Sequence, residues 1–274
     1  MSAATGIKRA QFDHVSLAFT TSKGALRVVE DVSYDINDGD FIAVIGPSGC
    51  GKTTMMSMLA GFQKPTTGKV LFDGQPVKGP GPERGVIFQE YGVFPWLTVK
   101  ENIAFGLKLK ANHALASGRD QICEHYLDLM GLSDFANSYP KHLSGGMRQR
   151  LAIARAYAVK PQFLLMDEPF GALDAQTRAN MQNLLLQVLA AEGKTVMLIT
   201  HSVEEAIYLA SRIVVVTARP ARIKEIIEVP FAYPRDESLQ GRSEFVELRS
   251  YIRELVMSEY RAQQAQMRPA SFSE

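Results

Sequence analysis

The chain of 274 residues has few cysteines, almost no net charge and no long apolar run. Its two cysteines, Cys50 and Cys123, are too few for a disulfide framework and suit a reducing cytosol. The formal net charge of +1 gives no basic surface field of the kind that holds nucleic acid, so no nucleic-acid partner is expected. Apolar runs such as 41–45 and 213–216 are far shorter than the roughly 20 residues that a membrane-spanning helix needs.

The first eleven residues are small and polar, with two basic side chains, and they lack the apolar core of a signal peptide. The sequence therefore predicts a chain that stays in the cytosol, so that any path across a membrane is supplied by another subunit. The composition, 46% hydrophobic and 22% charged residues, is that of an ordinary globular protein.

The order of the sequence patterns predicts an α/β fold. Residues 12–38 alternate apolar and polar side chains, which indicates antiparallel strands. From residue 41 onward, short apolar segments alternate with segments of helical period, and this predicts a mainly parallel sheet covered on both faces. The expected strands are 41–45, 69–72, 76–77, 86–88, 163–166, 195–200 and 212–217, and the expected helices are 52–61, 174–192 and 203–210.

Between residues 98 and 143 the hydrophobic period is helical, which predicts a mostly helical insert. Helices in and just after this stretch are expected at 98–110, 117–131 and 146–159.

The segment after Pro230 is expected to begin as a loop and to continue as an amphipathic helix near 243–263. The apolar face of this helix consists of Phe245, Leu248, Ile252, Leu255 and Val256. We expect this face to pack on its own domain; dimerisation and binding of a regulator are the alternatives.

A glycine-rich segment lies between the strand at 41–45 and the helix at 52–61. Its sequence, GPSGCGKT at 46–53, fits the pattern G-x-x-x-x-G-K-[ST] in full. The glycines let backbone N–H groups curl around an anion, and the following helix directs its N-terminus at the same point. Lys52 is expected to reach the β- and γ-phosphates of a nucleotide, and Thr53 to hold Mg²⁺. The alternative is a plain glycine-rich turn. Such a turn does not require a strand before it and a helix after it, and both are expected here.

Two adjacent carboxylates follow a short apolar run in the sequence FLLMDEP at 163–169. We expect a buried strand to deliver Asp167 beside the phosphate-binding loop, where it coordinates Mg²⁺ directly or through water. Glu168 points differently and is placed to orient or deprotonate an attacking water. Paired acids at a strand end are also common as plain surface residues, and only the glycine-rich loop favours the catalytic interpretation.

A second helix start of the anion-binding kind is predicted at 143–149, where the sequence LSGGMRQ places a serine and two glycines before a helix. Taken alone it would be an ordinary capped helix start. Two phosphate-binding helix starts in one chain make sense if two copies meet head to tail and each completes the nucleotide site of the other.

Together these segments resemble the ATPases of the ABC transporter family, over about residues 12–230. Residues 46–53 match the Walker A motif of that family, 143–149 its signature and 163–168 its Walker B motif with the catalytic glutamate. The Q-loop glutamine, the D-loop at 172–174 and the switch histidine are matched by Gln89, Asp174 and His201.

The resemblance implies a P-loop NTPase cassette of the α/β class. Its mainly parallel sheet core would carry an N-terminal antiparallel β subdomain and a helical subdomain inserted at about 91–160. The ATPase domain would span 12–230, and residues 231–274 would form a C-terminal extension with the amphipathic helix.

The resemblance also implies ATP and Mg²⁺ as cofactors. Glu168, His201 and Gln89 are the expected catalytic residues, and Thr53, Gln89 and Asp167 the expected Mg²⁺ ligands. The residues expected to contact the nucleotide are Phe19, Gly46, Pro47, Ser48, Gly49, Cys50, Gly51, Lys52, Thr53, Thr54, Ser144, Gly145, Gly146 and Asp174.

Two positions depart from the usual form of the family. The signature has Met147 where glutamine is commonest, although Ser144 and Gly146 are kept. The aromatic residue expected to stack on adenine is Phe19 rather than tyrosine, and a longer loop is expected at 20–27; a half-buried strand aromatic is the alternative for Phe19. The place of Cys50 at a helix start suggests a lowered pKa and a modifiable thiol; the alternative, which we favour, is that a small residue is simply what fits there.

Segments 79–98 and 205–223 resemble one branch of the family, the nitrate, sulfonate and taurine importer ATPases. This implies multi-span membrane permease subunits, a solute-binding protein outside the membrane, and a place on the cytoplasmic face of a bacterial inner membrane. The apolar loop at 93–97 is then a candidate surface for a helix of the permease; the alternative is that it joins the core of the helical insert.

The expected mechanism is closure of a homodimer around two MgATP molecules, which drives the membrane subunits between two states. The main alternative is an ABC ATPase without a transport role, although such chains usually carry two cassettes or a long coiled-coil insertion. A membrane exporter or signalling ATPase is another. A P-loop kinase leaves the segment at 143–149 unexplained, and a GTPase lacks its guanine-specifying N-K-x-D motif.

Overall fold

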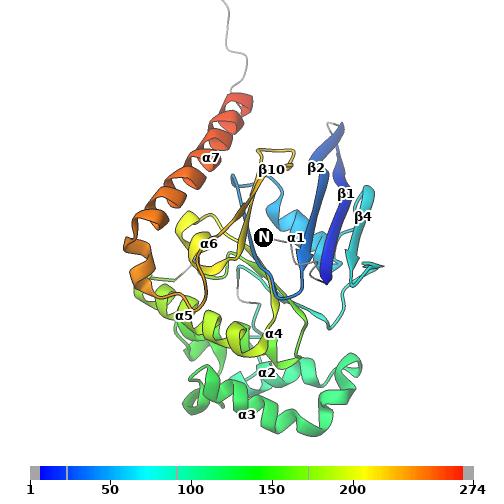
Figure 1. The fold of residues 1–274 in the computed structure, drawn as a ribbon. Coiled ribbons are helices and arrows are strands. Elements are labelled where there is room, and N and C mark those ends of the chain that lie inside the picture. The colour runs from blue at the N-terminus through cyan, green and yellow to red at the C-terminus, as the bar shows by residue number, and fades with distance from the viewer. Residues whose placement is uncertain (1–6, 23, 91, 172, 268–274) are drawn as a thin grey trace, which may run out of the picture. The chain divides into compact units, whose positions relative to one another are not determined.

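The computed structural model describes residues 7–22, 24–90, 92–171 and 173–267, which fall into two compact units (Figure 1). The first unit combines the chain up to residue 80 with the chain from residue 195 onward, and the second consists of residues 81–194. The helical period that the sequence shows between 98 and 143 belongs entirely to the second unit.

The first unit contains two sheets. Its strands are β1 (Lys8–Thr21), β2 (Gly24–Asn37), β3 (Phe41–Ile45), β4 (Thr67–Phe72), β5 (Gln75–Pro76), β8 (Thr195–Ile199), β9 (Arg212–Val216) and β10 (Ile223–Glu228). Its helices are α1 (Lys52–Ala60), α6 (Val203–Leu209) and α7 (Ser243–Met267), with a 3₁₀ turn at Glu237–Gly241.

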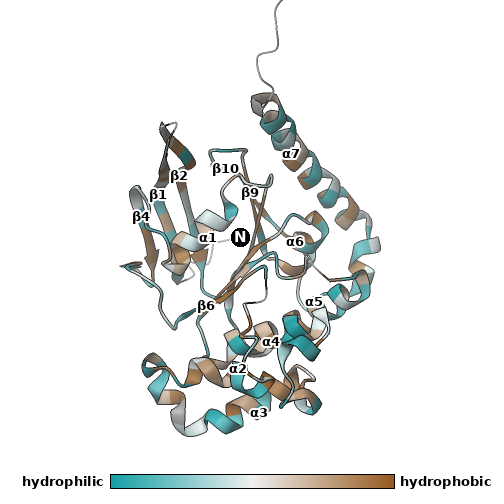
Figure 2. Ribbon diagram, turned by 180° about the vertical axis from the view of Figure 1, so that it is seen from behind, coloured by the Kyte–Doolittle hydropathy of each residue, from teal (hydrophilic) through white to brown (hydrophobic). Residues whose placement is uncertain are grey.

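One sheet of the first unit is antiparallel, in the order β2-β1-β4-β5, and its strands lie side by side in Figure 1. In the other, β3 pairs in parallel with both β8 and β9, and β10 pairs antiparallel with β9. All residues of β3 and β8 are buried, as expected for strands covered on both faces. The central strands are correspondingly hydrophobic in Figure 2.

The second unit holds two strands and most of the helices. The strands β6 (Arg84–Ile87) and β7 (Phe163–Asp167) pair in parallel. The helices are α2 (Val99–Leu107), α3 (Arg119–Leu129), α4 (Gly145–Ala158) and α5 (Ala175–Glu192), with 3₁₀ segments at Lys110–Gly118, Ser133–Phe135 and Pro140–His142. The expected helical segments are thus confirmed, with ends that differ by a few residues.

Local sequence explains the turns that were predicted well. Asp73 and Gly74 both have positive φ, 47° and 73°, as a two-residue hairpin turn of type I′ requires, and they join β4 to β5. By contrast, the prediction of a longer loop at 20–27 is wrong. The ladder between β1 and β2 continues to the pair Thr21↔Gly24, so most of this segment is strand.

The amphipathic helix α7 begins at the expected residue and runs four residues beyond the expected end. Phe245 and Ile252 are fully buried, and α7 contacts α6 within the first unit. The prediction that this face packs on its own domain is therefore confirmed. The alternation of apolar and polar residues along α7 is visible in Figure 2.

A buried arginine ties the chain before α7 to the end of α6. The Nη1 of Arg235 donates hydrogen bonds to the carbonyl oxygens of Ile207, Tyr208 and Ala210 at 2.8, 3.1 and 2.9 Å. These carbonyls belong to the last turn of a helix, where no intrahelical donor reaches them. Burial lowers the pKa of Arg235, and the carbonyl oxygens compensate part of that cost.

We expect the substitution Arg235→Ala to lower the free energy of unfolding by about 2–4 kcal/mol, because several carbonyl groups lose a charged donor at once. Urea denaturation measures this value. The exposed Arg242 offers a matched control, since Arg242→Ala should change stability by less than about 0.5 kcal/mol. Equal effects of the two substitutions would contradict the structural role of Arg235.

Candidate functional site

The phosphate-binding loop lies between the buried strand β3 and helix α1 in the first unit. Gly51 is the N-cap of α1, with φ of 129° and no side-chain cap, so no capping side chain occupies the N–H groups of the first turn. A Cβ at Gly51 would lie 2.9 Å from the carbonyl oxygen of Val28, and one at Gly46 would lie 2.7 Å from Cγ2 of Val216. Glycine is therefore required at both ends of the loop, as is usual for a loop whose backbone N–H groups bind an anion.

Lys52 supplies a buried positive charge to this loop. Its side chain is 6% exposed, and its Nζ donates hydrogen bonds to the carbonyl oxygens of Gly46 (2.9 Å) and Pro47 (2.8 Å). An ammonium group has three donors, so one is left to reach a phosphate oxygen. Thr53 follows in the first turn of α1, and it is exposed.

His201 lies at the same sheet edge as the phosphate-binding loop. Strands β3 and β8 are parallel, with Val44 opposite Ile199, so both carboxyl ends meet there. The amide N–H of Thr200, the next residue, donates to the carbonyl oxygen of Val44 at 3.3 Å. His201 itself is exposed, and the structure thus brings together two segments that are about 150 residues apart in sequence.

Phe19 lies on β1, opposite Leu26 of β2, and it is 41% exposed. Its accessible ring is compatible with contact to a base, and stacking on adenine stays a prediction.

The suggestion of a lowered pKa for Cys50 is wrong. Its side chain is completely buried, and this burial raises the pKa of the thiol, against the smaller opposing effect of the Lys52 charge. The burial agrees instead with the alternative expectation, that a small residue is what fits at this position of the loop.

In the second unit, Gln89 and the two carboxylates meet at the edge of the β6–β7 pair. These strands are parallel, with Ile87 opposite Met166, and Asp167 is the last residue of β7. Gln89 is two residues beyond its strand and Glu168 one residue beyond its own, so both follow the same edge. Asp167 is 9% exposed and Glu168 is partly exposed.

The backbone of Glu168 is unusual, because its φ is 45°, in the left-handed region that glycine favours. Strained residues of this kind cluster at functional sites, where the surrounding structure holds them in place. The turn is closed by the amide N–H of Gly171, which donates to the carbonyl oxygen of Glu168 at 3.2 Å.

The start of α4 and the start of α5 pack together in the second unit. Ser144 is the N-cap of α4, and its hydroxyl accepts a hydrogen bond from the N–H of Met147 at 3.3 Å. Thr177 approaches Gly146 so closely that a Cβ there would lie 2.5 Å from the Cγ2 of Thr177. The structure therefore brings the predicted signature next to α5.

Asp174 is the N-cap of α5 and accepts a hydrogen bond from the N–H of Thr177 at 3.0 Å. This bond lowers the pKa of Asp174. The capping role accounts for an aspartate at this position, and contact with nucleotide stays a prediction. Ala172, in the same predicted loop, lies outside the described residues.

Sequence reasoning missed two residues that shape the loop after Gln89. Asn102 is fully buried in α2; its Oδ1 accepts from the N–H of Phe94 at 2.8 Å, and its Nδ2 donates to the carbonyl oxygens of Phe94 and Leu97, both at 3.0 Å. Arg155 donates to the carbonyl oxygen of Gly92, and its guanidinium lies 4.4 Å from the ring centre of Phe94. An asparagine in an apolar helical period was the available signal.

For the apolar loop at 93–97, packing into its own unit is confirmed for Phe94, and contact with a permease stays a prediction. Phe94 packs into its own unit, with its ring centre 4.5 Å from that of Phe105. Trp96 remains 69% exposed, so an apolar surface is left for another molecule.

We expect Asn102→Ala to lower the free energy of unfolding by about 2–4 kcal/mol and to loosen the loop at 93–97, because it removes the three hydrogen bonds of the Asn102 side chain to Phe94 and Leu97. Urea denaturation and hydrogen exchange at the Phe94 amide measure the two effects. Asn102→Asp is the matched variant, since it keeps the acceptor for that amide and should retain part of its protection. Unchanged exchange at Phe94 in Asn102→Ala would contradict the anchoring role.

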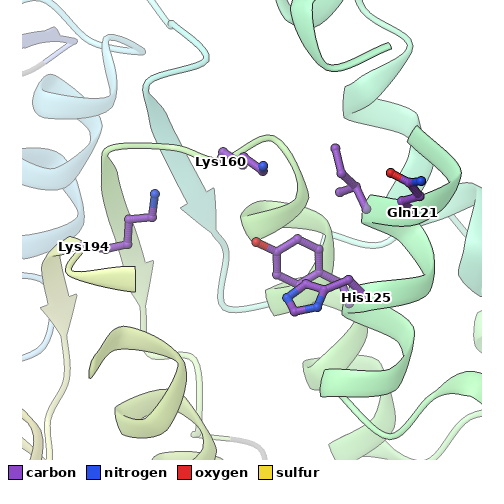
Figure 3. Close-up of a pocket in the computed structure, with 6 residues that line it drawn as sticks. Gln121, His125, Lys160 and Lys194 are labelled. Carbon is purple, nitrogen blue, oxygen red and sulfur yellow. The ribbon is translucent and has the colours of Figure 1, made fainter. Parts of the chain in front are cut away.

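A separate hollow of about 430 Å³ lies in the second unit (Figure 3). It is lined by Gln121, Ile122, His125, Tyr126, Lys160 and Lys194. It includes none of the predicted site residues, so it is not the nucleotide site expected from the sequence.

Among the helices of the described residues, none is both long and apolar enough to span a bilayer.

Comparison with known proteins agrees with this arrangement. Residues 29–171 match the model of the family described as ABC transporter. The chain is 44% identical over 241 residues to the nitrate import ATP-binding protein NrtD of Synechococcus elongatus, covering 87% of this chain and 88% of that protein. It is 47% identical over 255 residues to the taurine import ATP-binding protein TauB of Burkholderia pseudomallei, covering 89% and 95%.

Among solved structures, a dimeric ATP-binding cassette in a post-hydrolysis state, bound to ADP and Pi, matches with a TM-score of 0.71. It is 29% identical in sequence, and the match covers 81% of this chain and 100% of that chain. The fold class predicted from the sequence and the resemblance to the importer ATPases are both confirmed. The chain belongs to the ABC transporter family, as one of its ATP-binding ATPase subunits.

Proposed function

We propose that the chain hydrolyses MgATP as a head-to-tail homodimer and couples hydrolysis to the uptake of a small solute of the nitrate, sulfonate or taurine type. The observation that carries the ATPase site is the open phosphate-binding loop, in which Gly46 and Gly51 are sterically required and Lys52 places a buried charge. The assignment to the importer branch rests on the two relatives named as import ATP-binding proteins, which match this chain over almost its full length.

In this proposal, residues 46–54 wrap the phosphates of ATP, and Phe19 contacts the base. Ser144, Gly145 and Gly146 of the partner copy contact the γ-phosphate from the other side, with Asp174 nearby. The start of α4 suits this role, because the N-terminal end of a helix dipole favours negative charge and the first turn has no acidic side chain.

The residues present fit a magnesium ion that arrives with the nucleotide. Mg²⁺ is usually held by one or two carboxylates together with phosphate oxygens and water. Thr53, Gln89 and Asp167 offer a hydroxyl, an amide oxygen and a buried carboxylate. When bound, Mg²⁺ neutralises charge on the phosphates.

Hydrolysis itself is assigned to three side chains of this chain. Glu168 orients the attacking water and accepts its proton, and its strained backbone is of the kind found at functional sites. His201 contacts the γ-phosphate, and Gln89 links the site to the loop at 93–97. The product state then releases the dimer contacts.

We propose the exposed Trp96 and its neighbours as the surface that receives the membrane subunits, which places the chain on the cytoplasmic face of the membrane. A solute-binding protein outside the membrane completes the assembly. The ATPase domain spans 12–230 with its helical subdomain at about 91–160, and residues 231–274 form an extension.

A tagged chain purified from gently solubilised native membranes tests the transport role. The expected result is a multi-span membrane protein among the co-purifying chains, which mass spectrometry identifies. Substituting Trp96 by Ala should weaken this association, and the exposed Tyr139, replaced in the same way, is the control. Exclusively soluble partners, or nucleic acid, would leave the ATPase in place and overturn the transport role.

A further inference from the structure

Two side chains from the distal part of the chain contact the carbonyl oxygens of the phosphate-binding loop. Arg219, in the turn after β9, donates from both Nε (3.0 Å) and Nη2 to the carbonyl oxygen of Gly49. Gln263, near the end of α7, donates from Nε2 to the carbonyl oxygen of Ser48 at 3.0 Å. All four residues belong to the first unit, and neither donor was among the residues expected to contact the nucleotide.

These contacts bear on the direction of the loop's N–H groups. A peptide unit is planar and trans, so its C=O and its N–H point to opposite sides. Holding the carbonyl oxygen of Gly49 therefore fixes the N–H of Cys50, which in this structure donates to the carbonyl oxygen of Pro47 at 3.4 Å. Holding the carbonyl oxygen of Ser48 fixes the N–H of Gly49. Anion binding by a glycine-rich loop depends on such N–H groups pointing to one place.

The turn that carries Arg219 is itself anchored by α7. Glu259 accepts a hydrogen bond from the N–H of Ala218 at 2.9 Å, and its other oxygen pairs with Lys224 at 2.6 Å. Burial alone would raise the pKa of Glu259, but its bonds to Lys224 and Ala218 lower it, so the carboxylate stays ionised at neutral pH. The C-terminal helix therefore helps to hold the turn that carries Arg219, together with the bonds of Thr217 within that turn.

We propose that Arg219 and Gln263 are positioning residues for nucleotide binding, which hold the phosphate-binding loop in its anion-receptive shape from the outside. In this proposal the C-terminal helix α7 contributes to nucleotide binding. This inference rests on the proposed phosphate-binding role of residues 46–54.

The first test is the affinity of the purified full-length chain for ATP and ADP, measured by isothermal titration calorimetry. Arg219→Ala should weaken the binding of both by about tenfold, since one charge-assisted contact is lost. Arg219→Lys, which keeps the charge but not the two-donor geometry, should lose only part of the affinity. The melting temperature without nucleotide should stay close to that of the wild type, which separates positioning from global stability.

Arg222 provides a matched control on the same turn. It carries the same charge, but its guanidinium pairs with Glu30, at 2.7 Å, instead of the phosphate-binding loop. Arg222→Ala should leave affinity within about twofold of the wild type, whereas a general electrostatic effect would weaken binding in both variants.

The second test uses α7. Gln263→Ala should weaken ATP binding by about threefold, as expected for a neutral hydrogen bond, and the exposed neighbour Gln264 serves as the control. Glu259→Gln should weaken it as well, since it loosens the turn that carries Arg219.

The outcomes separate this inference from the function on which it depends. Wild-type affinity in Arg219→Ala, or tighter binding, would overturn the positioning role, provided that Lys52→Ala still abolishes binding. Undiminished binding in Lys52→Ala would instead overturn the proposed phosphate site.

Discussion

The substitution Glu168→Gln is expected to lower ATP turnover by about 10²–10⁴-fold and to leave ATP binding intact, because removal of a general base costs about this much in rate. Glutamine has nearly the same shape as glutamate but cannot accept the proton of the attacking water. The residue lies one position beyond β7, and its φ of 45° is in the left-handed region. A residue that acts only structurally would not cause so large a loss.

Single-turnover hydrolysis and equilibrium binding of ATP measure the two quantities separately. Since hydrolysis is expected to reopen the dimer, the variant should also accumulate as a dimer in the presence of MgATP, which size-exclusion chromatography detects. Glu228→Gln, at the exposed end of β10, is a matched control with unchanged turnover. A variant Glu168→Gln that retains turnover would remove the catalytic assignment.

Motifs that depend on local geometry could be predicted from the sequence. The strand–loop–helix order around Lys52 and the apolar run before Asp167 determine where the chain emerges from a sheet, and parallel pairing then collects such ends at one edge. For this reason the neighbourhood of His201 and the phosphate-binding loop was predictable. This prediction requires only the positions of the strand ends in the sequence, and no knowledge of side-chain packing.

Features that depend on contacts between distant segments could not be predicted. The burial of Cys50 is one example, because a helix start suggested an accessible thiolate while packing makes it inaccessible. Strand β10 was missed, since its sequence, IKEIIE, carries three charges and has the half-exposed pattern of an edge strand. The contacts of Arg219 and Gln263 with the loop join residues about 170 and 215 positions apart, so no sequence spacing indicated them.

The substitution Lys52→Ala is expected to weaken ATP binding by about 100-fold. The ammonium group is 6% exposed and satisfies the carbonyl oxygens of Gly46 and Pro47, so its loss affects the ligand and the loop together. A charged hydrogen bond to a phosphate oxygen is worth about 1.5–3 kcal/mol, which corresponds to roughly 10–150-fold in affinity. The two carbonyl oxygens left without their donor add a further cost to the shape of the loop.

The number of phosphates on the ligand separates these two contributions. ATP and ADP carry the β-phosphate that Lys52 is expected to reach, whereas AMP does not, so AMP binding should respond only to the change in loop shape. Calorimetry with the three nucleotides should therefore give a large loss for ATP and ADP and a small one for AMP. The exposed Lys64, just beyond α1, is the control for charge alone, and Lys64→Ala should bind all three normally. An equal loss for AMP and ATP would show that Lys52 acts by shaping the loop and would contradict its direct contact with phosphate.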